Sequence, residues 1–121
     1  MGDRSQHVVI LVTTSDRDEA ERIAEAAVTQ KLAGSAQISA LDTWYRWEGS
    51  VRQAAEHEVR LFTRAACFDA VAALVRTLHG YDVPQVIALP IVRGTPDFLR
   101  WIDETSDGVV AEKTVDSNGP A

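Results

Sequence analysis

Residues 36–63 read AQISALDTWYRWEGSVRQAAEHEVRLFT, and this stretch decides the fold of the 121-residue chain. Two strand-like runs, 36–47 and 50–63, flank Glu48-Gly49, which signals a hairpin because glycine accepts the positive φ of primed turns. Both arms exceed the usual strand length of about 5–6 residues, so we expect a bulge or a bend within each. The returning arm alternates between two faces of a sheet. One face carries Val59, Leu61 and Thr63, and the other carries Glu58, Arg60 and Phe62.

Three of the eight aromatic residues of the chain, Trp44, Tyr45 and Trp47, lie beside this turn. Strand alternation directs Tyr45 and Trp47 to one face and Trp44 to the other. Each ring can bury about 150–250 Å², and a two-stranded ribbon has little core to cover it. Trp and Tyr are enriched in interface cores. We therefore expect Trp44, Tyr45 and Trp47 to form an oligomer interface in which the hairpin extends the sheet of a neighbouring subunit.

Toward the N-terminus, His7–Thr13 is a short apolar, β-branched run that is typical of a buried strand. A helix follows, with Ser15 or Asp16 as its N-cap and Gly34 as its expected terminator. The acids Asp16, Asp18 and Glu19 at its start resemble a metal site. The interpretation that we favour is stabilisation of carboxylates by the helix dipole.

Toward the C-terminus, the pattern predicts a helix over 67–79 that ends at Gly80, and a strand over 83–92. Pro90 belongs on an edge, at a bulge or past the paired part of that strand. Thr95 and Pro96 predict the start of another helix. We expect a short flexible N-terminus over 1–6, one domain over 7–105 and a disordered tail over 106–121.

The order of elements is therefore β-α-β-β-α-β with an extended hairpin and an extra C-terminal helix. This order predicts an α+β, ferredoxin-like fold, in which two helices cover one face of an antiparallel sheet. That fold hosts many functions and decides none of them.

Composition narrows the classes of function. The chain has 12 basic and 18 acidic side chains and a net charge of −6, which argues against binding to nucleic acid or an anionic membrane. Its single cysteine excludes an intrachain disulfide and fits a reducing compartment. No segment approaches the ~20 apolar residues of a membrane span, and the N-terminus lacks the apolar core of a secretory signal. We expect a cytoplasmic protein.

Several motifs resemble the CutA (divalent-cation tolerance) family, in order and almost without gaps from about residue 8 to 105. They are Lys31-Leu32-Ala33, Thr43-Trp44-Tyr45-Arg46-Trp47-Glu48-Gly49, His79-Gly80-Tyr81-Asp82-Val83-Pro84-Gln85, Ala88-Leu89-Pro90 and Phe98-Leu99-Arg100-Trp101. The resemblance implies a cytoplasmic homotrimer with clefts between its subunits, similar in architecture to the PII signalling proteins. It also implies an association with tolerance of copper and other divalent metals, which some members bind, and no established enzyme activity.

The resemblance also points to a metal site that this chain has largely lost. In copper-binding bacterial members, a cysteine on the first strand and two adjacent histidines near the end of the second helix supply ligands. Val12, Leu78 and His79 stand at those positions, and Ser35 replaces another family cysteine. His79 remains the candidate ligand for copper or another divalent cation, alone or as three copies in a trimer. The alternative is that His79 interacts with the C-terminal dipole of a helix.

Two other residue types with metal or redox chemistry carry less weight. Cys67 lies at the expected start of the second helix, where a helix dipole favours a reactive thiolate; the alternative is a small residue in a first helical turn. His57 lies between Glu56 and Glu58, but strand neighbours point to opposite faces.

The family cleft suggests an inter-subunit pocket formed by Trp47, Glu58, Arg64 and Tyr81. Charged residues in mostly apolar strands need partners, so an interfacial ion pair that fixes assembly is an equal alternative.

The expected function is a trimeric small-ligand or divalent-metal-binding protein in tolerance of, or response to, copper and other divalent cations. The alternative is a PII-like signalling or protein-interaction module that binds a metabolite or a partner at inter-subunit clefts without direct metal binding. We expect no enzyme activity, because the sequence shows no nucleophile–base pair, zinc-ligand spacing or phosphate-binding glycine loop.

Overall fold

A computed structural model describes residues 6–81 and 83–108. In chain order the elements are β1 (His7–Thr14), α1 (Arg17–Thr29), β2 (Ser35–Trp47), β3 (Ser50–Arg64), a 3₁₀ turn (Ala65–Cys67), α2 (Phe68–Leu78), β4 (Val86–Pro90) and α3 (Pro96–Thr105).

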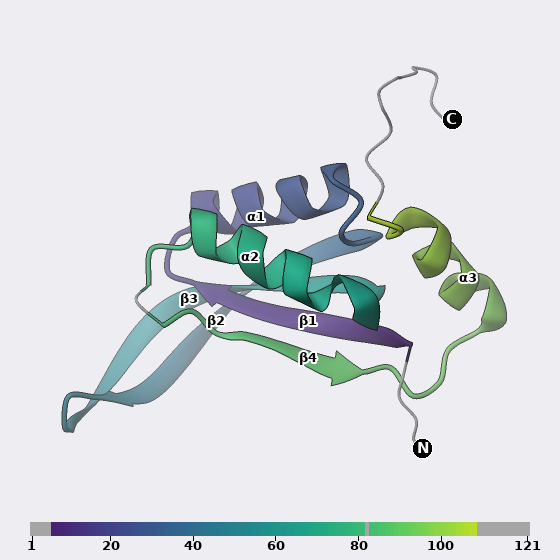
Figure 1. The fold of residues 1–121 in the computed structure, drawn as a ribbon. Coiled ribbons are helices and arrows are strands. Elements are labelled where there is room, and N and C mark those ends of the chain that lie inside the picture. The colour runs from purple at the N-terminus through teal and green to yellow at the C-terminus, as the bar shows by residue number, and fades with distance from the viewer. Residues whose placement is uncertain (1–5, 82, 109–121) are drawn as a thin grey trace.

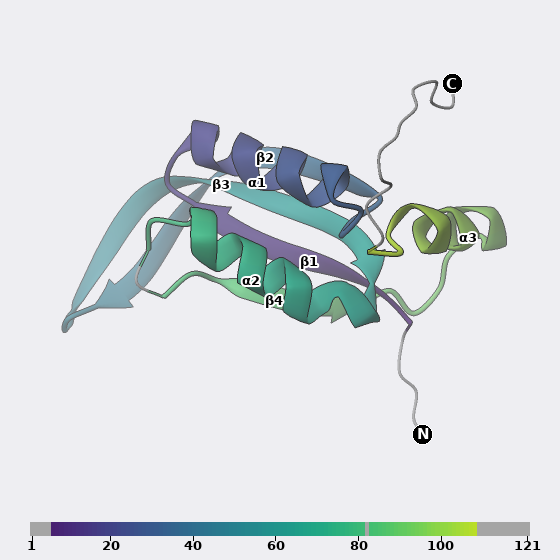
Figure 2. The same ribbon diagram turned by 45° about the horizontal axis from the view of Figure 1, so that its top comes forward.

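The four strands form one antiparallel sheet in the order β2-β3-β1-β4. Helices α1 and α2 lie side by side on one face of this sheet, while α3 lies beyond the end where β1 begins (Figures 1 and 2). At the opposite end, the β2–β3 hairpin projects past the other strands. The predicted α+β, ferredoxin-like fold with an extended hairpin and a C-terminal helix is confirmed.

The core forms between the sheet and the two helices. Ile10 and Val12 of β1 alternate toward the helices, as do Val59 and Leu61 of β3, and all four side chains are fully buried. They pack with apolar residues of α1 and α2, namely Ala20, Ile23, Ala27, Val71 and Val75. Complete burial of one such Val, Leu or Ile side chain stabilises the fold by roughly 1.5–3 kcal/mol. The helix face of the sheet is therefore occupied, and no helix of the described residues covers the opposite, helix-free face.

The hairpin pairs without interruption from Ser35 opposite Phe62 to Trp47 opposite Ser50. No residue is inserted in either arm, so the bulge that we allowed for is absent. The ribbon instead curves as it leaves the sheet (Figures 1 and 2). Glu48 and Gly49 both have positive φ, 51° and 83°, as the predicted two-residue primed turn requires.

The prediction that Gly34 terminates α1 is wrong. The helix ends at Thr29, and Lys31 takes the left-handed conformation (φ 60°). The N–H groups of Lys31 and Leu32 donate to the carbonyls of Val28 and Ala27, at 3.0 and 2.9 Å, which is a Schellman motif. Gly34 instead directly precedes β2, and its N–H donates to the carbonyl of Phe62 at 2.8 Å.

Other element boundaries agree more closely with the sequence. Asp16 is the N-cap of α1, and its side chain accepts from the N–H of Asp18 at 3.0 Å. Thr95 and Pro96 begin α3 as predicted. Strand β4 is shorter than the predicted 83–92, and Pro90 is its last residue on an edge of the sheet, where a missing N–H costs little.

The packed body continues past residue 105. Ser106 is fully buried, and the N–H of Gly108 donates to the carbonyl of Lys31 at 2.8 Å. Residues 106–108, predicted to be part of the tail, therefore belong to the packed body; residues 1–5 and 109–121 lie outside the described part of the chain. Among the residues described, no helix is long and apolar enough to cross a membrane.

Candidate functional site

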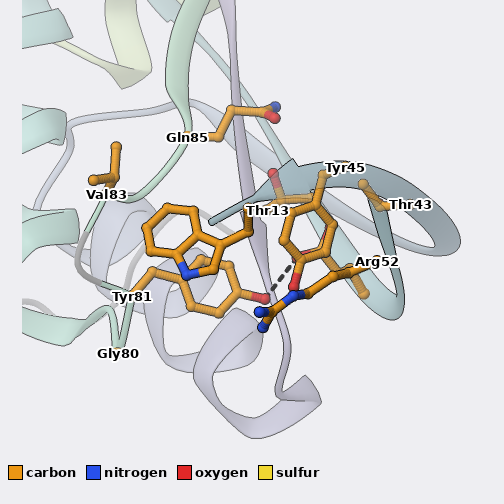
Figure 3. A pocket seen from close by; sticks show the side chains of 10 residues that line it. Thr13, Thr43, Tyr45, Arg52, Gly80, Tyr81, Val83 and Gln85 are labelled. Carbon is orange, nitrogen blue, oxygen red and sulfur yellow. Dashed lines mark hydrogen bonds between the residues drawn. The ribbon is translucent and has the colours of Figure 1, made fainter. Parts of the chain in front are cut away.

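A pocket of about 470 Å³ lies where the projecting hairpin meets the segment between α2 and β4 (Figure 3). Its volume falls in the range of small-molecule sites. The hairpin and the end of β1 supply one part of the lining: Thr13, Thr43, Tyr45, Trp47, Arg52 and Glu56. The segment after α2 supplies the rest: Gly80, Tyr81, Val83 and Gln85.

The register of the hairpin explains which of its side chains reach the pocket. Tyr45 lies opposite Arg52, and residues two apart along an arm share a face, so Thr43, Trp47 and Glu56 lie on that same face. Trp44 lies on the other face and is 65% exposed. As strand alternation predicts, Tyr45 and Trp47 lie on one face of the hairpin and line the pocket, whereas Trp44 lies on the other face.

Tyr81 connects the segment after α2 to the hairpin. Its hydroxyl donates to Oε2 of Glu56 at 2.6 Å, and Glu56 is buried. Burial and this hydrogen bond to Glu56 raise the pKa of Tyr81 to about 12. The phenol therefore stays protonated at neutral pH and continues to donate to the carboxylate, which gives a buried acid the partner that it needs.

His79 links Tyr81 to the end of β1 through its two ring nitrogens. Nε2 lies 2.6 Å from the carbonyl oxygen of Thr13, and Nδ1 accepts from the N–H of Tyr81 at 3.1 Å. A carbonyl only accepts and an N–H only donates, so these contacts assign a neutral ring protonated on Nε2. The two rings also contact each other, with centroids 4.7 Å apart.

The residues at the three family metal positions do not fit a copper site within one chain. Val12 is fully buried in the hydrophobic core, and Leu78 packs against that core. His79 has both nitrogens in hydrogen bonds, so a metal ion would have to displace one of them. Within residues 6–81 and 83–108, no group of three His, Cys, Asp or Glu side chains is placed to hold a metal ion.

The acids at the start of α1 have separate roles. Asp16 caps the helix, and Glu19 is buried and accepts a short hydrogen bond from the hydroxyl of Thr14. Their positions at the helix N-terminus agree with stabilisation by the dipole.

Of the four residues expected in the cleft, one chain brings together Trp47 and Tyr81. Glu58 lies outside the lining, opposite Thr13, and its carboxylate is 3.7 Å from Arg60. Arg64 lies at the far end of β3, where its Nε donates to the carbonyl of Ser106 at 2.7 Å.

Cys67 and His57 lie outside the pocket. Cys67 is buried at the start of α2, and its thiol donates to the same Ser106 carbonyl at 3.2 Å. It helps to anchor the end of α3. His57 is on the helix face of β3, away from Glu56 and Glu58, as alternation predicts, and its Nδ1 is buried without a partner among the described residues.

Sequence reasoning missed Arg52 and Glu56 as pocket residues. Strand alternation could have identified them, because both residues share a face with Tyr45 and Trp47 once the two-residue turn fixes the register. The family resemblance placed Tyr81 in a cleft with Trp47, but the sequence did not show its hydrogen bond to Glu56.

The fold and the pocket define a class of protein: ferredoxin-like domains whose overlong hairpin forms a polar, aromatic pocket with the segment after α2. The family described as CutA1 divalent ion tolerance protein matches residues 8–105. This chain belongs to that family.

Individual relatives and solved structures support the same family assignment. The divalent-cation tolerance protein CutA of Archaeoglobus fulgidus is 38% identical over 82% of this chain and 97% of its own length. Its solved structure, described as a periplasmic divalent cation tolerance protein, has a TM-score of 0.81 and covers 83% of this chain and 98% of that one. CutA1 of Shewanella sp. SIB1 has a TM-score of 0.82 at 35% identity, over 86% of this chain and 98% of that one. The chloroplastic CutA 1 protein of Oryza sativa is 35% identical over 82% of this chain, and the match covers 56% of the rice protein.

Proposed function

We propose that this chain is a trimeric binding protein that contributes to divalent-cation tolerance by binding a small ligand in the pocket between the hairpin and the segment after α2. The observation that carries the proposal is the pocket itself. Its lining includes two half-exposed aromatic rings, Tyr45 and Trp47. The hydrogen bond between Tyr81 and Glu56 fixes another part of the lining. The names of the relatives supply the link to divalent cations.

The proposed trimer rests on exposed apolar side chains. Ile87 and Leu89 of β4 are 46% and 47% exposed on the helix-free face of the sheet. Beyond the end of that sheet, α3 exposes Phe98 and Trp101. Together with the hairpin rings, these exposed apolar side chains favour association with other copies, because large exposed apolar patches mark interaction surfaces. Neighbouring copies that covered them would turn the open pocket into a cleft between subunits.

In this role the protein binds a small ligand and not a copper ion. The direct alternative is a divalent cation at His79. Calorimetric titration with Cu²⁺ and Zn²⁺ tests it: saturable binding that His79→Ala abolishes would support a metal site there. Binding that is absent, or unchanged in His79→Ala, fits the small-ligand role.

We further propose binding without catalysis, in the cytoplasm. The described lining of the pocket pairs no serine or cysteine nucleophile with a histidine base, and its one carboxylate already accepts from Tyr81. The single cysteine of the chain supports a reducing compartment. Cell fractionation tests the location.

A thermal-shift screen against a metabolite library tests the small-ligand role, because a ligand that binds only the folded state raises the melting temperature. A pocket ligand should stabilise the wild type and Trp44→Ala, whose altered ring is on the opposite face of the hairpin, but not Trp47→Ala. Light scattering on each variant checks that assembly is intact. The proposal fails if no compound shifts the transition, or if Trp47→Ala responds like the wild type.

A further inference from the structure

We infer that the ligand of this pocket is a small planar aromatic molecule that carries a carboxylate or a similar planar anion, with Arg52 as the residue that selects the charge. The inference deepens the proposed function and rests on it.

Arg52 has donors to spare. Its Nε donates to the hydroxyl of Ser50 at 3.4 Å, and a terminal nitrogen forms an exposed ion pair with Oε1 of Glu48 at 3.7 Å, which is longer than a hydrogen bond. Exposed ion pairs are weak, so a ligand carboxylate can compete with Glu48 for the guanidinium. The Arg52 side chain is 45% exposed, so ligands can reach it. Tyr45 lies opposite Arg52 in the hairpin register, and both line the pocket with Tyr81 (Figure 3). A guanidinium binds a planar carboxylate through two parallel hydrogen bonds.

The acid of the pocket does not offer an equivalent site for a cation. Oε2 of Glu56 already accepts from Tyr81, and the residue is only 7% exposed. An ammonium ligand would have to compete with that hydrogen bond and would meet the positive charge of Arg52. The remaining polar lining, Thr13, Thr43 and Gln85, is neutral. Among the described lining residues, the accessible charge is therefore that of Arg52.

The aromatic lining selects a flat ring. Tyr45 and Trp47 are 41% and 42% exposed and share one face of the hairpin with Arg52. Rings prefer offset-stacked or edge-to-face contacts with other rings, which a planar ligand between them provides. A volume of about 470 Å³ accommodates one or two fused rings with an acidic substituent.

Three probes of nearly equal size separate charge from shape: benzoate, benzyl alcohol and benzylammonium. Calorimetry on the assembled protein at pH 7 and low salt should show benzoate bound at least about tenfold more tightly than benzyl alcohol, as a charge-assisted hydrogen bond requires. Benzylammonium should bind most weakly.

Arg52→Gln should bring benzoate to the affinity of benzyl alcohol. Arg46→Gln is the matched control, because Arg46 lies on the opposite face of the same hairpin, and it should keep the preference. Tighter binding of benzylammonium than of benzoate, or an equal effect of both substitutions, would overturn the assignment of charge while the pocket stands. Failure of all three probes to bind would overturn this inference; if the metabolite screen also found no pocket ligand, the proposed function would fall with it.

Discussion

At the scale of single residues, Lys31 occupies a conformation that suits glycine better. It is the C′ residue of α1 with φ 60°, where a β-carbon costs about 1 kcal/mol. Lys31→Gly should therefore stabilise the fold by about 0.5–1 kcal/mol in urea unfolding. Lys31→Ala is the control and should give no such gain, because alanine keeps the β-carbon. Equal stability of the two variants would mean that the left-handed residue is not strained.

The raised pKa of Tyr81 can be measured directly by absorbance. In Tyr45→Phe, which leaves Tyr81 as the only tyrosine, absorbance at 295 nm should report a pKa of about 12 against the ordinary value of 10.0. Glu56→Gln should lower this pKa only in part, because burial is the larger cause. A titration midpoint at pH 10 would contradict the Tyr81–Glu56 contact.

The same shift makes stability depend on pH. The pKa of Tyr81 is raised in the folded state, so its contribution to stability is complete below pH 10, where the unfolded tyrosine is also neutral. As the pH rises from 10 to about 12, only the unfolded state ionises, and that contribution is lost. Tyr81→Phe should flatten the decline in unfolding free energy over this window, and an unchanged slope would argue against it.

Residue roles in the pocket were only partly visible in the sequence. The exposed pair Tyr45 and Trp47 followed from strand alternation alone. The role of His79 did not, because its two hydrogen bonds join Thr13, 66 residues away, to Tyr81 two residues on. Contacts of that kind depend on tertiary packing, which no local pattern encodes.

At the scale of elements, Gly34 is where α3 docks on the start of β2. A β-carbon there would overlap the hydroxyl oxygen of Thr105 and lie 3.2 Å from the ring of Trp101. Gly34→Ala should destabilise the fold by about 1–3 kcal/mol, as overpacking does. Adding Thr105→Ala to Gly34→Ala should recover part of that loss in a double-mutant cycle. Additive effects of the two substitutions would show that α3 is not held at this contact.

The elements themselves follow from the sequence where the signal is local. The hairpin turn at Glu48-Gly49 and the N-caps Asp16 and Thr95 were predicted because each depends on a few adjacent residues. The end of α1 was not predicted correctly. The left-handed position that usually holds glycine is occupied by Lys31, and Gly34 instead allows close packing against α3.

At the scale of the whole molecule, the helix-free face of the sheet should control assembly. Leu89→Lys places a charge among side chains that we propose are covered by other copies, where an unpaired charge is costly. The variant should have a lower mass in solution and a lower melting temperature. Val28→Lys, at a 39% exposed position on α1, is the control and should keep the wild-type mass.

The mass of the wild-type protein at micromolar concentration, measured by light scattering, tests most directly whether the hairpin and the helix-free face belong to an assembled binding protein. A trimer predicts about three times the 13.2 kDa of one chain. A value of 13.2 kDa would contradict it, since the exposed rings of the hairpin would then remain in water and the pocket would stay open on one side.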